Sequence, residues 1–275
     1  MAECNYQIAA SVIKEAKAFI ITAGAGMGVD SGLPDFRGEH GFWKAYPAYA
    51  KLGLSFEECA TPMHFISNLH FAWGFYGHRT NLYRNTIPHE GFQIIKNWLA
   101  RNGADYFVAT SNVDGQFQKA GYDEKRIYEV HGSIHWLQCQ NRCTNSIWSN
   151  EAQFTIDETT MRADAPLPQC PDCEKICRPN ILMFDDYAWL QQRTRNQGSA
   201  FDLFLKKHAD SQIAIIELGA GVAIPTIRMM SIQIGSKLRH ATVIRINPCE
   251  AAIASPHVSL LSGALSALQH IDELL

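Results

Sequence analysis

The sequence predicts an α/β fold with a largely parallel sheet, and three observations lead to that prediction. Short apolar runs alternate with segments of helical periodicity along most of the chain. Several of these runs end in glycine, asparagine or histidine, and parallel sheets bind ligands beyond the carboxyl ends of their strands. Clustered cysteines and prolines between residues 137 and 179 interrupt the alternation, which indicates an inserted metal-binding module.

Apolar spacing predicts the individual elements. Residues 5–17 predict a lead-in helix, residues 18–21 a buried strand, and residues 88–99 a capped amphipathic helix. Residues 41–87 carry many aromatic side chains at helical spacing, which predicts a small helical module. The chain from about Val258 onward predicts a closing helix. Five further apolar runs predict strands, namely residues 106–110, 127–130, 181–184, 213–218 and 242–246.

Composition limits the class of protein. The 275 residues suffice for one large domain, or for a domain with a small insertion, and 47% hydrophobic and 19% charged residues are ordinary for a globular chain. A net charge of −3 argues against a nucleic-acid partner. No apolar run reaches the length of a membrane span, and the first residues lack the pattern of a signal peptide. We therefore expect a cytoplasmic protein with no membrane partner, and the oligomeric state stays open.

The first predicted strand leads into a glycine-rich segment, residues 22–38. Gly24 and Gly26 allow backbone N–H groups to approach a phosphate, because no Cβ stands in the way. Glycine after a strand is often only a turn, and the acidic residue expected about 20 positions later in a dehydrogenase falls in a loop-like region. A standard dehydrogenase is therefore disfavoured. Asp35, Phe36 and Arg37 add a carboxylate, an aromatic ring and a guanidinium that a simple phosphate loop does not need.

Two other strand ends carry polar side chains. Asn112 and Asp114 follow the strand at residues 106–110, where a hydrogen-bonded turn is the simpler interpretation of the pattern alone. His131 follows the strand at residues 127–130, and a neutral imidazole near pH 7 can act as a general base. A lone histidine is more often a surface or core residue, but its place beside two other polar strand ends favours a site.

The cysteine spacing predicts a metal site. Cys139 and Cys143 form one pair, and Cys170 and Cys173 form another, so that four thiolates can close a tetrahedral structural zinc site. Incidental reduced cysteines are the alternative, which the Cys-Pro-Asp-Cys sequence of the second pair disfavours. Cys177 is a spare thiol that could replace one of the four.

Tyr76 and Arg79 share one face of a predicted helix at spacing i, i+3. Together they could bind a carboxylate, with the guanidinium forming a bidentate pair and the phenol donating its hydroxyl. A helix that covers the core and leaves Arg79 in solvent is the alternative, and both interpretations stay open at this point.

In combination these motifs resemble the sirtuins, NAD-dependent protein lysine deacylases, in order along nearly the whole chain. Residues 110–115, Thr-Ser-Asn-Val-Asp-Gly, resemble the family's Thr-Gln-Asn-Ile-Asp-Gly block, and the four cysteines resemble its zinc ribbon. The other matching segments are residues 24–26 with 32–37 (the NAD loop), 129–133 (the catalytic histidine block), 178–184 (the strand beside the peptide groove) and 246–247 (the contact with the adenosine ribose).

The resemblance implies a Rossmann-like parallel sheet that binds NAD, with a small domain made of a helical insertion and a zinc-ribbon insertion. The cleft between the two domains would hold NAD. The implied boundaries are residues 1–40, 88–136 and 180–275 for the NAD-binding domain, 41–87 for the helical module, and 137–179 for the zinc-binding module.

The resemblance also implies residue roles. An acylated protein lysine would react at C1′ of the nicotinamide ribose, giving nicotinamide, free lysine and an O-acyl-ADP-ribose. His131 would deprotonate a ribose hydroxyl, Asn112 would hold the ribose and a water, Asp114 would hold the carboxamide, and Phe36 would shield C1′ from water. Further implied NAD-binding residues are Gly24, Ala25, Gly26, Asp35, Arg37, Ser111, Gly219, Ala220, Asn247 and Leu265, and implied substrate-binding residues are Tyr76, Arg79, Met183 and Phe184.

Three departures from the family pattern affect these expectations. Ser111 replaces a glutamine near the nicotinamide pocket, and Gly219–Gly221 replaces Gly-Thr-Ser, so we expect altered contact with NAD. Asp185 replaces a glycine beside the peptide groove, which affects peptide binding more than NAD binding.

The Tyr76 and Arg79 pair resembles that of sirtuins that accept succinyl, malonyl or glutaryl lysine.

Two other functions remain as alternatives at this stage. One is an NAD glycohydrolase or ADP-ribosyltransferase, which consumes NAD without an acyl-peptide. The other is a non-catalytic module that binds NAD or ADP-ribose, against which the retention of Asn112, Asp114 and His131 together argues.

Overall fold

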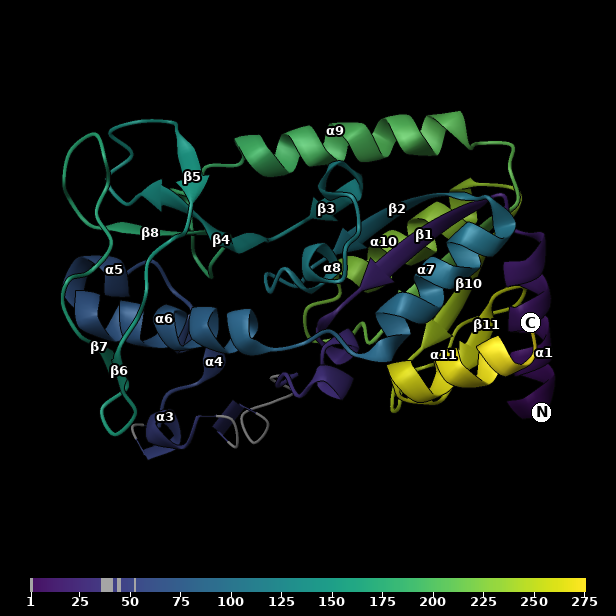
Figure 1. The fold of residues 1–275 in the computed structure, drawn as a ribbon, viewed down its shortest axis with the longest axis horizontal. Coiled ribbons are helices and arrows are strands. Elements are labelled where there is room, and N and C mark those ends of the chain that lie inside the picture. Colours follow the sequence, from purple (N-terminus) through teal and green to yellow (C-terminus); the bar gives the residue numbers. More distant parts are fainter. Residues whose placement is uncertain (1, 36–41, 44–45, 52) are drawn as a thin grey trace.

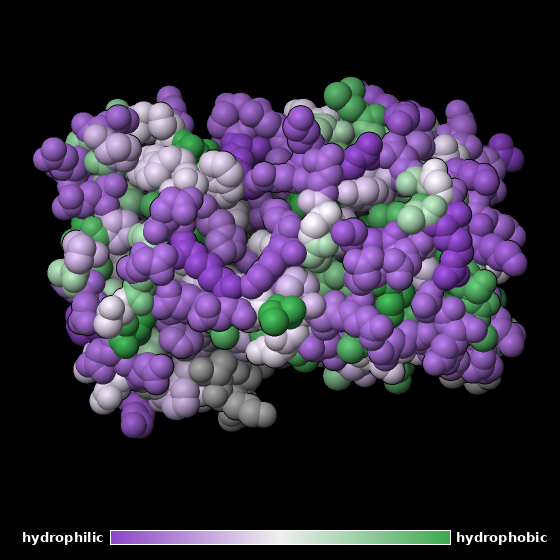
Figure 2. Space-filling view, viewed as in Figure 1, coloured by the Kyte–Doolittle hydropathy of each residue, from purple (hydrophilic) through white to green (hydrophobic). Residues whose placement is uncertain are grey.

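The computed structural model describes residues 2–35, 42–43, 46–51 and 53–275, and Figure 1 shows two parts. One part is a sheet covered by helices and contains both ends of the described chain. The other contains the helix α6 and several short strands. Figure 2 shows mostly hydrophilic side chains on the face in view, with hydrophobic ones scattered among them. Within the described residues, no helix has both the length and the apolar character to cross a bilayer.

The central sheet has six strands in the order β11-β10-β9-β1-β2-β3, and every neighbouring pair is parallel. The chain leaves β1 toward β2 and β3, and later returns on the other side as β9, β10 and β11. This reversal places a crevice at the carboxyl ends of β1 and β9, where parallel sheets bind ligands. The strands are β1 (Ala18–Ala23), β2 (Asp105–Thr110), β3 (Ile127–Glu129), β9 (Ile213–Leu218), β10 (Ala241–Ile246) and β11 (Val258–Leu260).

Helices cover both faces of this sheet, which is why β1 and β9 are buried along their whole length. On one face, α1 (Ala2–Glu15), α7 (Glu90–Asn102) and α11 (Ala264–Glu273) pack their apolar side chains against the sheet. On the other face lie α9 (Gln192–Lys207) and α10 (Thr226–Lys237). The predicted α/β class with a parallel sheet is confirmed. Short elements complete this part, namely α8 (Gln116–Lys119), η1 (Ala25–Met27), η2 (Val29–Ser31) and η3 (Glu124–Arg126).

The second part has its own apolar core, in which aromatic side chains of α6 meet a small antiparallel sheet of order β5-β4-β8. This sheet consists of β4 (Gly132–Cys139), β5 (Ile147–Ser149) and β8 (Cys177–Ile181), and β6 (Ile156–Asp157) pairs with β7 (Arg162–Ala163). The described helices are α3 (Pro47–Lys51), α4 (Phe56–Cys59), α5 (His64–Ser67) and α6 (Leu69–Asn85). The domain boundaries given above stay a prediction.

Two predicted elements differ from the structure. The strand predicted at residues 181–184 is wrong, because β8 ends at Ile181 and the following segment folds back on itself. The cause is Asp186, whose carboxylate pairs with Arg178 and accepts the backbone N–H groups of Met183 and Ala188. The closing helix is preceded by β11, a strand of three residues that carries too little apolar pattern to predict.

Candidate active site

A cavity of about 380 Å³ opens at the carboxyl ends of the parallel strands. Each of β1, β2, β3 and β9 delivers its following loop to the cavity wall, and α6 with the segment after β8 supplies the opposite wall. The lining residues from the strand ends include Gly24, Ala25, Gly26, Asp35, Ser111, Asn112, Asp114, His131, Gly219, Ala220 and Gly221. Those from the opposite wall include Tyr76, Arg79, Tyr83, Met183 and Phe184.

The glycine loop after β1 packs directly on the turn after β9. The Gly26 N–H donates to the Gly219 carbonyl over 3.1 Å, and Gly219 has a φ of +60°. A Cβ on Gly219 would lie 2.3 Å from the Gly26 Cα atom, so only glycine allows this contact. Among the described residues, the N–H groups of Ala25, Ala220 and Gly221 have no protein acceptor. These three amides at the cavity wall suit a diphosphate.

Asn112 and Asp114 are fixed by the loops around them. The Asn112 side-chain amide donates to the Gly24 carbonyl over 2.9 Å, which ties the loop after β2 to the glycine loop. The Asp114 carboxylate accepts the Gln116 N–H over 2.9 Å, and its residue is only 8% exposed. Burial raises the pKa of Asp114 to about 6 because the charged form loses hydration.

His131 has a defined place at the end of β3. The following Gly132 has a φ of +80°, and a Cβ there would lie 2.1 Å from the Asn180 carbonyl oxygen. Burial lowers the pKa of His131 because the charged form loses hydration, and the nearby Ser111 backbone opposes this only in part. The imidazole is therefore neutral near pH 7 and can accept a proton.

Thr226 and His135 were not identified from the sequence, but they contact His131 and Asp114. The Thr226 hydroxyl lies 3.4 Å from His131 Nε2, at the first turn of α10. His135 Nε2 lies 2.9 Å from the Asp114 carbonyl oxygen, and since a carbonyl only accepts, that nitrogen carries the proton. Thr226 is remote from His131 in the sequence, so no local signal could have found it.

The opposite wall buries a cation. Arg79 is only 6% exposed and lines the cavity together with Tyr76 and Tyr83, so the interpretation that left its side chain in solvent is wrong. All three come from one face of α6. Tyr83 was missed, although its position four residues after Arg79 on the same helix was a signal.

The segment after β8 uses most of its own backbone donors. The Leu182 N–H donates to the His131 carbonyl, the Met183 N–H to Asp186, and the Phe184 N–H to the Ala60 carbonyl. Asp185 is exposed, with a φ of +54° that a glycine adopts more readily. Met183 and Phe184 thus line the cavity from a segment that is held in place.

Four cysteine sulfurs converge beside the small sheet. The sulfurs of Cys139, Cys143, Cys170 and Cys173 all lie within 4.8 Å of one another. The Cys139–Cys173 and Cys143–Cys170 separations are 3.7 and 3.6 Å. Zn–S bonds of about 2.3 Å in a tetrahedron require sulfurs roughly 3.8 Å apart, so the set is consistent with structural zinc. Cys177 lies opposite Cys139 in the antiparallel register of β4 and β8, but it is not one of the four clustered cysteines.

Comparison with known proteins decides the family. A sequence model of the Sir2 family matches residues 24–206. The chain belongs to the Sir2 family. An NAD-dependent protein deacylase of Leptospira interrogans is 31% identical over 88% of this chain and 85% of its own length. The NAD-dependent protein deacylase sirtuin-5 of Danio rerio is 28% identical over 62% of this chain and 58% of its own length.

A solved Sir2 structure shows the same fold. A complex of a Sir2 homologue with NAD superimposes with a TM-score of 0.69 at 24% identity, covering 96% of this chain and 92% of the other. The sequence-based recognition of a sirtuin is therefore confirmed. The individual site residues stay proposals.

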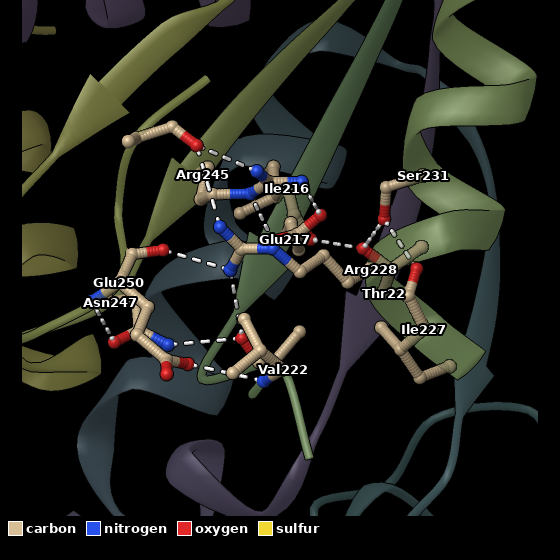
Figure 3. A network of polar contacts seen from close by, with 12 residues as sticks. Thr22, Ile216, Glu217, Val222, Ile227, Arg228, Ser231, Arg245, Asn247 and Glu250 are labelled. Atoms are coloured by element: carbon tan, nitrogen blue, oxygen red, sulfur yellow. Dashed lines mark hydrogen bonds and ion pairs between the residues drawn. The ribbon is translucent and has the colours of Figure 1, made fainter. Parts of the chain in front are cut away.

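Two NAD-binding residues implied by the Sir2 resemblance lie away from the cavity wall. The Asn247 amide donates to the Ala220 carbonyl over 3.0 Å, and its oxygen accepts the N–H groups of Cys249 and Glu250, as Figure 3 shows in part. Leu265 packs against the main core and donates its N–H to Asp30. Asn247 thus shapes the turn after β9, whose backbone lines the cavity.

A network of charged side chains supports the same turn (Figure 3). Glu217 and Arg245 form a fully buried ion pair between β9 and β10. Arg228 from α10 donates to the carbonyls of Ala220 and Glu250, over 3.3 and 2.8 Å. These bonds hold the Gly219–Gly221 turn. Phe36 and Arg37 lie outside the described residues, so their implied roles stay predictions.

Proposed function

We propose that this chain is an NAD-dependent protein lysine deacylase that releases nicotinamide and transfers the acyl group to ADP-ribose. The observation that carries the proposal is the meeting of three strand ends, with Ala25, Asn112 and His131, in one cavity. The names of the relatives, NAD-dependent protein deacylases, support it.

The cavity residues suit NAD, and different residues would contact different parts of it. NAD, when bound, supplies a ribose carbon whose bond to nicotinamide can be broken. The free amides of Ala25, Ala220 and Gly221 would bind the diphosphate. Asp114, ionised above its pKa of about 6, would accept from the carboxamide N–H. His131, neutral at pH 7, would accept the proton of a ribose hydroxyl.

The acyl group would lie in the part of the cavity that α6 borders. Tyr76 and Arg79 supply a phenol and a guanidinium there, which favour an acyl chain that ends in a carboxylate, such as succinyl or malonyl. Met183 and Phe184 would contact the acyl-lysine from the segment after β8. The proposed substrate is thus an acylated protein lysine, with a preference for acidic acyl groups.

Zinc would hold the small sheet together without taking part in the chemistry, because four thiolates leave no open coordination position. Thiolate ligands require reduced cysteines, and none of the eight cysteines is in a disulfide. We therefore place the protein in the cytoplasm, where thiols stay reduced.

A second candidate is an NAD glycohydrolase or ADP-ribosyltransferase. It is favoured by one observation, the segment at residues 182–186. The backbone donors of Leu182, Met183 and Phe184 are engaged within the chain, and Asp185 adds an exposed charge where a substrate strand would pair.

The two candidates differ in the dependence of NAD cleavage on an acyl-peptide. Incubation of the purified protein with NAD, with and without acetyl-lysine or succinyl-lysine peptides, would be followed by chromatography of nicotinamide. A deacylase releases nicotinamide only when an acyl-peptide is present. Equal release without peptide would contradict the proposal and favour the second candidate.

A further inference from the structure

Tyr83 holds the guanidinium of Arg79 inside the cavity. Arg79 Nε and Nη2 both donate to the Tyr83 hydroxyl, over 3.0 and 2.8 Å. The Arg79 Cζ atom also lies 5.1 Å from the ring centre of Phe75 and 5.5 Å from those of Phe56 and Tyr83. Two hydrogen bonds to one oxygen and three aromatic contacts fix both the position and the plane of this cation.

Tyr83 does this as a neutral phenol. Burial raises the pKa of its hydroxyl, so the group accepts from Arg79 without cancelling the positive charge.

We propose that Tyr83 determines specificity for acyl groups that end in a carboxylate, by fixing the position and the plane of the Arg79 guanidinium that would bind that carboxylate. The inference rests on the proposed deacylase function. Tyr76 lies one turn before Arg79 on the same helix face, and its phenol borders the same cavity. An acetyl group has no carboxylate and gains nothing from this arrangement.

Tyr83→Phe tests the proposal because it keeps the aromatic ring and removes only the hydroxyl. We would measure kcat/KM for matched succinyl-lysine and acetyl-lysine peptides, and the Kd of each peptide by calorimetry. The succinyl-to-acetyl ratio should fall about tenfold, the equivalent of one charge-assisted hydrogen bond, mainly through KM and Kd. In an Arg79→Met background, Tyr83→Phe should add little, since Tyr83 acts with Arg79.

Tyr122→Phe is the matched control. It also removes a buried phenol, one that donates to the Phe92 carbonyl over 2.8 Å in the main core, remote from the cavity lining. This variant should leave the succinyl-to-acetyl ratio unchanged. Thermal unfolding would check that each variant folds. If Tyr83→Phe does not fold, Arg79→Lys takes its place, because lysine keeps the charge but lacks the forked guanidinium that Tyr83 holds. Arg79→Lys should then lower the succinyl-to-acetyl ratio.

The outcomes separate the inference from the function on which it rests. Nicotinamide release with acyl-peptides but an unchanged ratio in Tyr83→Phe, or an equal loss with both peptides, would overturn the inference alone. No release with any acyl-peptide would overturn the proposed function and the inference with it.

Discussion

Asp114 illustrates at the residue scale how a functional group can oppose stability. Its folded pKa of about 6 lies above the reference value of 3.8, so its ionisation above pH 6 favours the unfolded chain. Asp114→Asn removes this cost, which we expect to raise stability at pH 8 by up to about 3 kcal/mol while lowering activity. Urea unfolding of both proteins at pH 5 and pH 8 would measure this gain in unfolding free energy. A gain that does not grow with pH would contradict the assignment.

Thr226 acts at the same scale on the proposed base. Its hydroxyl can donate only to the neutral form of His131 Nε2, which helps keep the pKa of His131 low. Thr226→Val should raise that pKa and move the acidic limb of the rate–pH profile to higher pH by roughly half to one unit. Activity should then fall at pH 6 more than at pH 8. Thr226→Ser should restore the profile, whereas an unchanged limb in Thr226→Val would rule out the contact.

At the scale of elements, one ion pair shapes the segment that borders the cavity. Arg178 and Asp186 are both fully buried, and the carboxylate also accepts the N–H groups of Met183 and Ala188. Asp186→Ala leaves an unpaired buried guanidinium, which costs about 3–5 kcal/mol of unfolding free energy. Urea unfolding would compare this loss with that of Asp157→Ala, which removes an exposed carboxylate at the end of β6 and should cost far less. A loss equal to that of Asp157→Ala would show that the pair does not hold the segment.

The small antiparallel sheet depends on the cysteine cluster in the same way. Cys173→Ala removes one of four sulfurs, so the chain should lose its zinc and the β5-β4-β8 sheet should unfold at a lower temperature. Cys177→Ala is the matched change outside the cluster and should keep one zinc per chain. Elemental analysis and thermal unfolding would measure both. If Cys173→Ala kept its zinc and Cys177→Ala lost it, Cys177 and not Cys173 would be the fourth zinc ligand.

At the scale of the whole molecule, the sequence predicts best what local pattern determines. The apolar run at residues 213–218 gives β9 with both ends correct, because a glycine turn bounds it. The same reasoning fails at residues 181–184, where the ion pair of Arg178 with Asp186 outweighs strand propensity. Spacing found the four cysteines, and the Sir2 resemblance pointed to the cavity side chains.

Contacts between remote segments could not be predicted. Thr226 meets His131 only because α10 begins beside the end of β3. Asn247 shapes a turn rather than lining the cavity, because its amide reaches back to Ala220. Such pairings depend on the order of strands in the sheet, and no local pattern encodes them.

The proposed reaction requires that one cavity hold NAD and the acyl-lysine together, so that each nicotinamide released accompanies one acyl transfer. The direct measurement is the stoichiometry of nicotinamide, deacylated peptide and O-acyl-ADP-ribose, followed by mass spectrometry in a single reaction. We predict equal amounts of all three products throughout the reaction. Nicotinamide in excess, with free ADP-ribose or ADP-ribosylated protein as the balance, would contradict it.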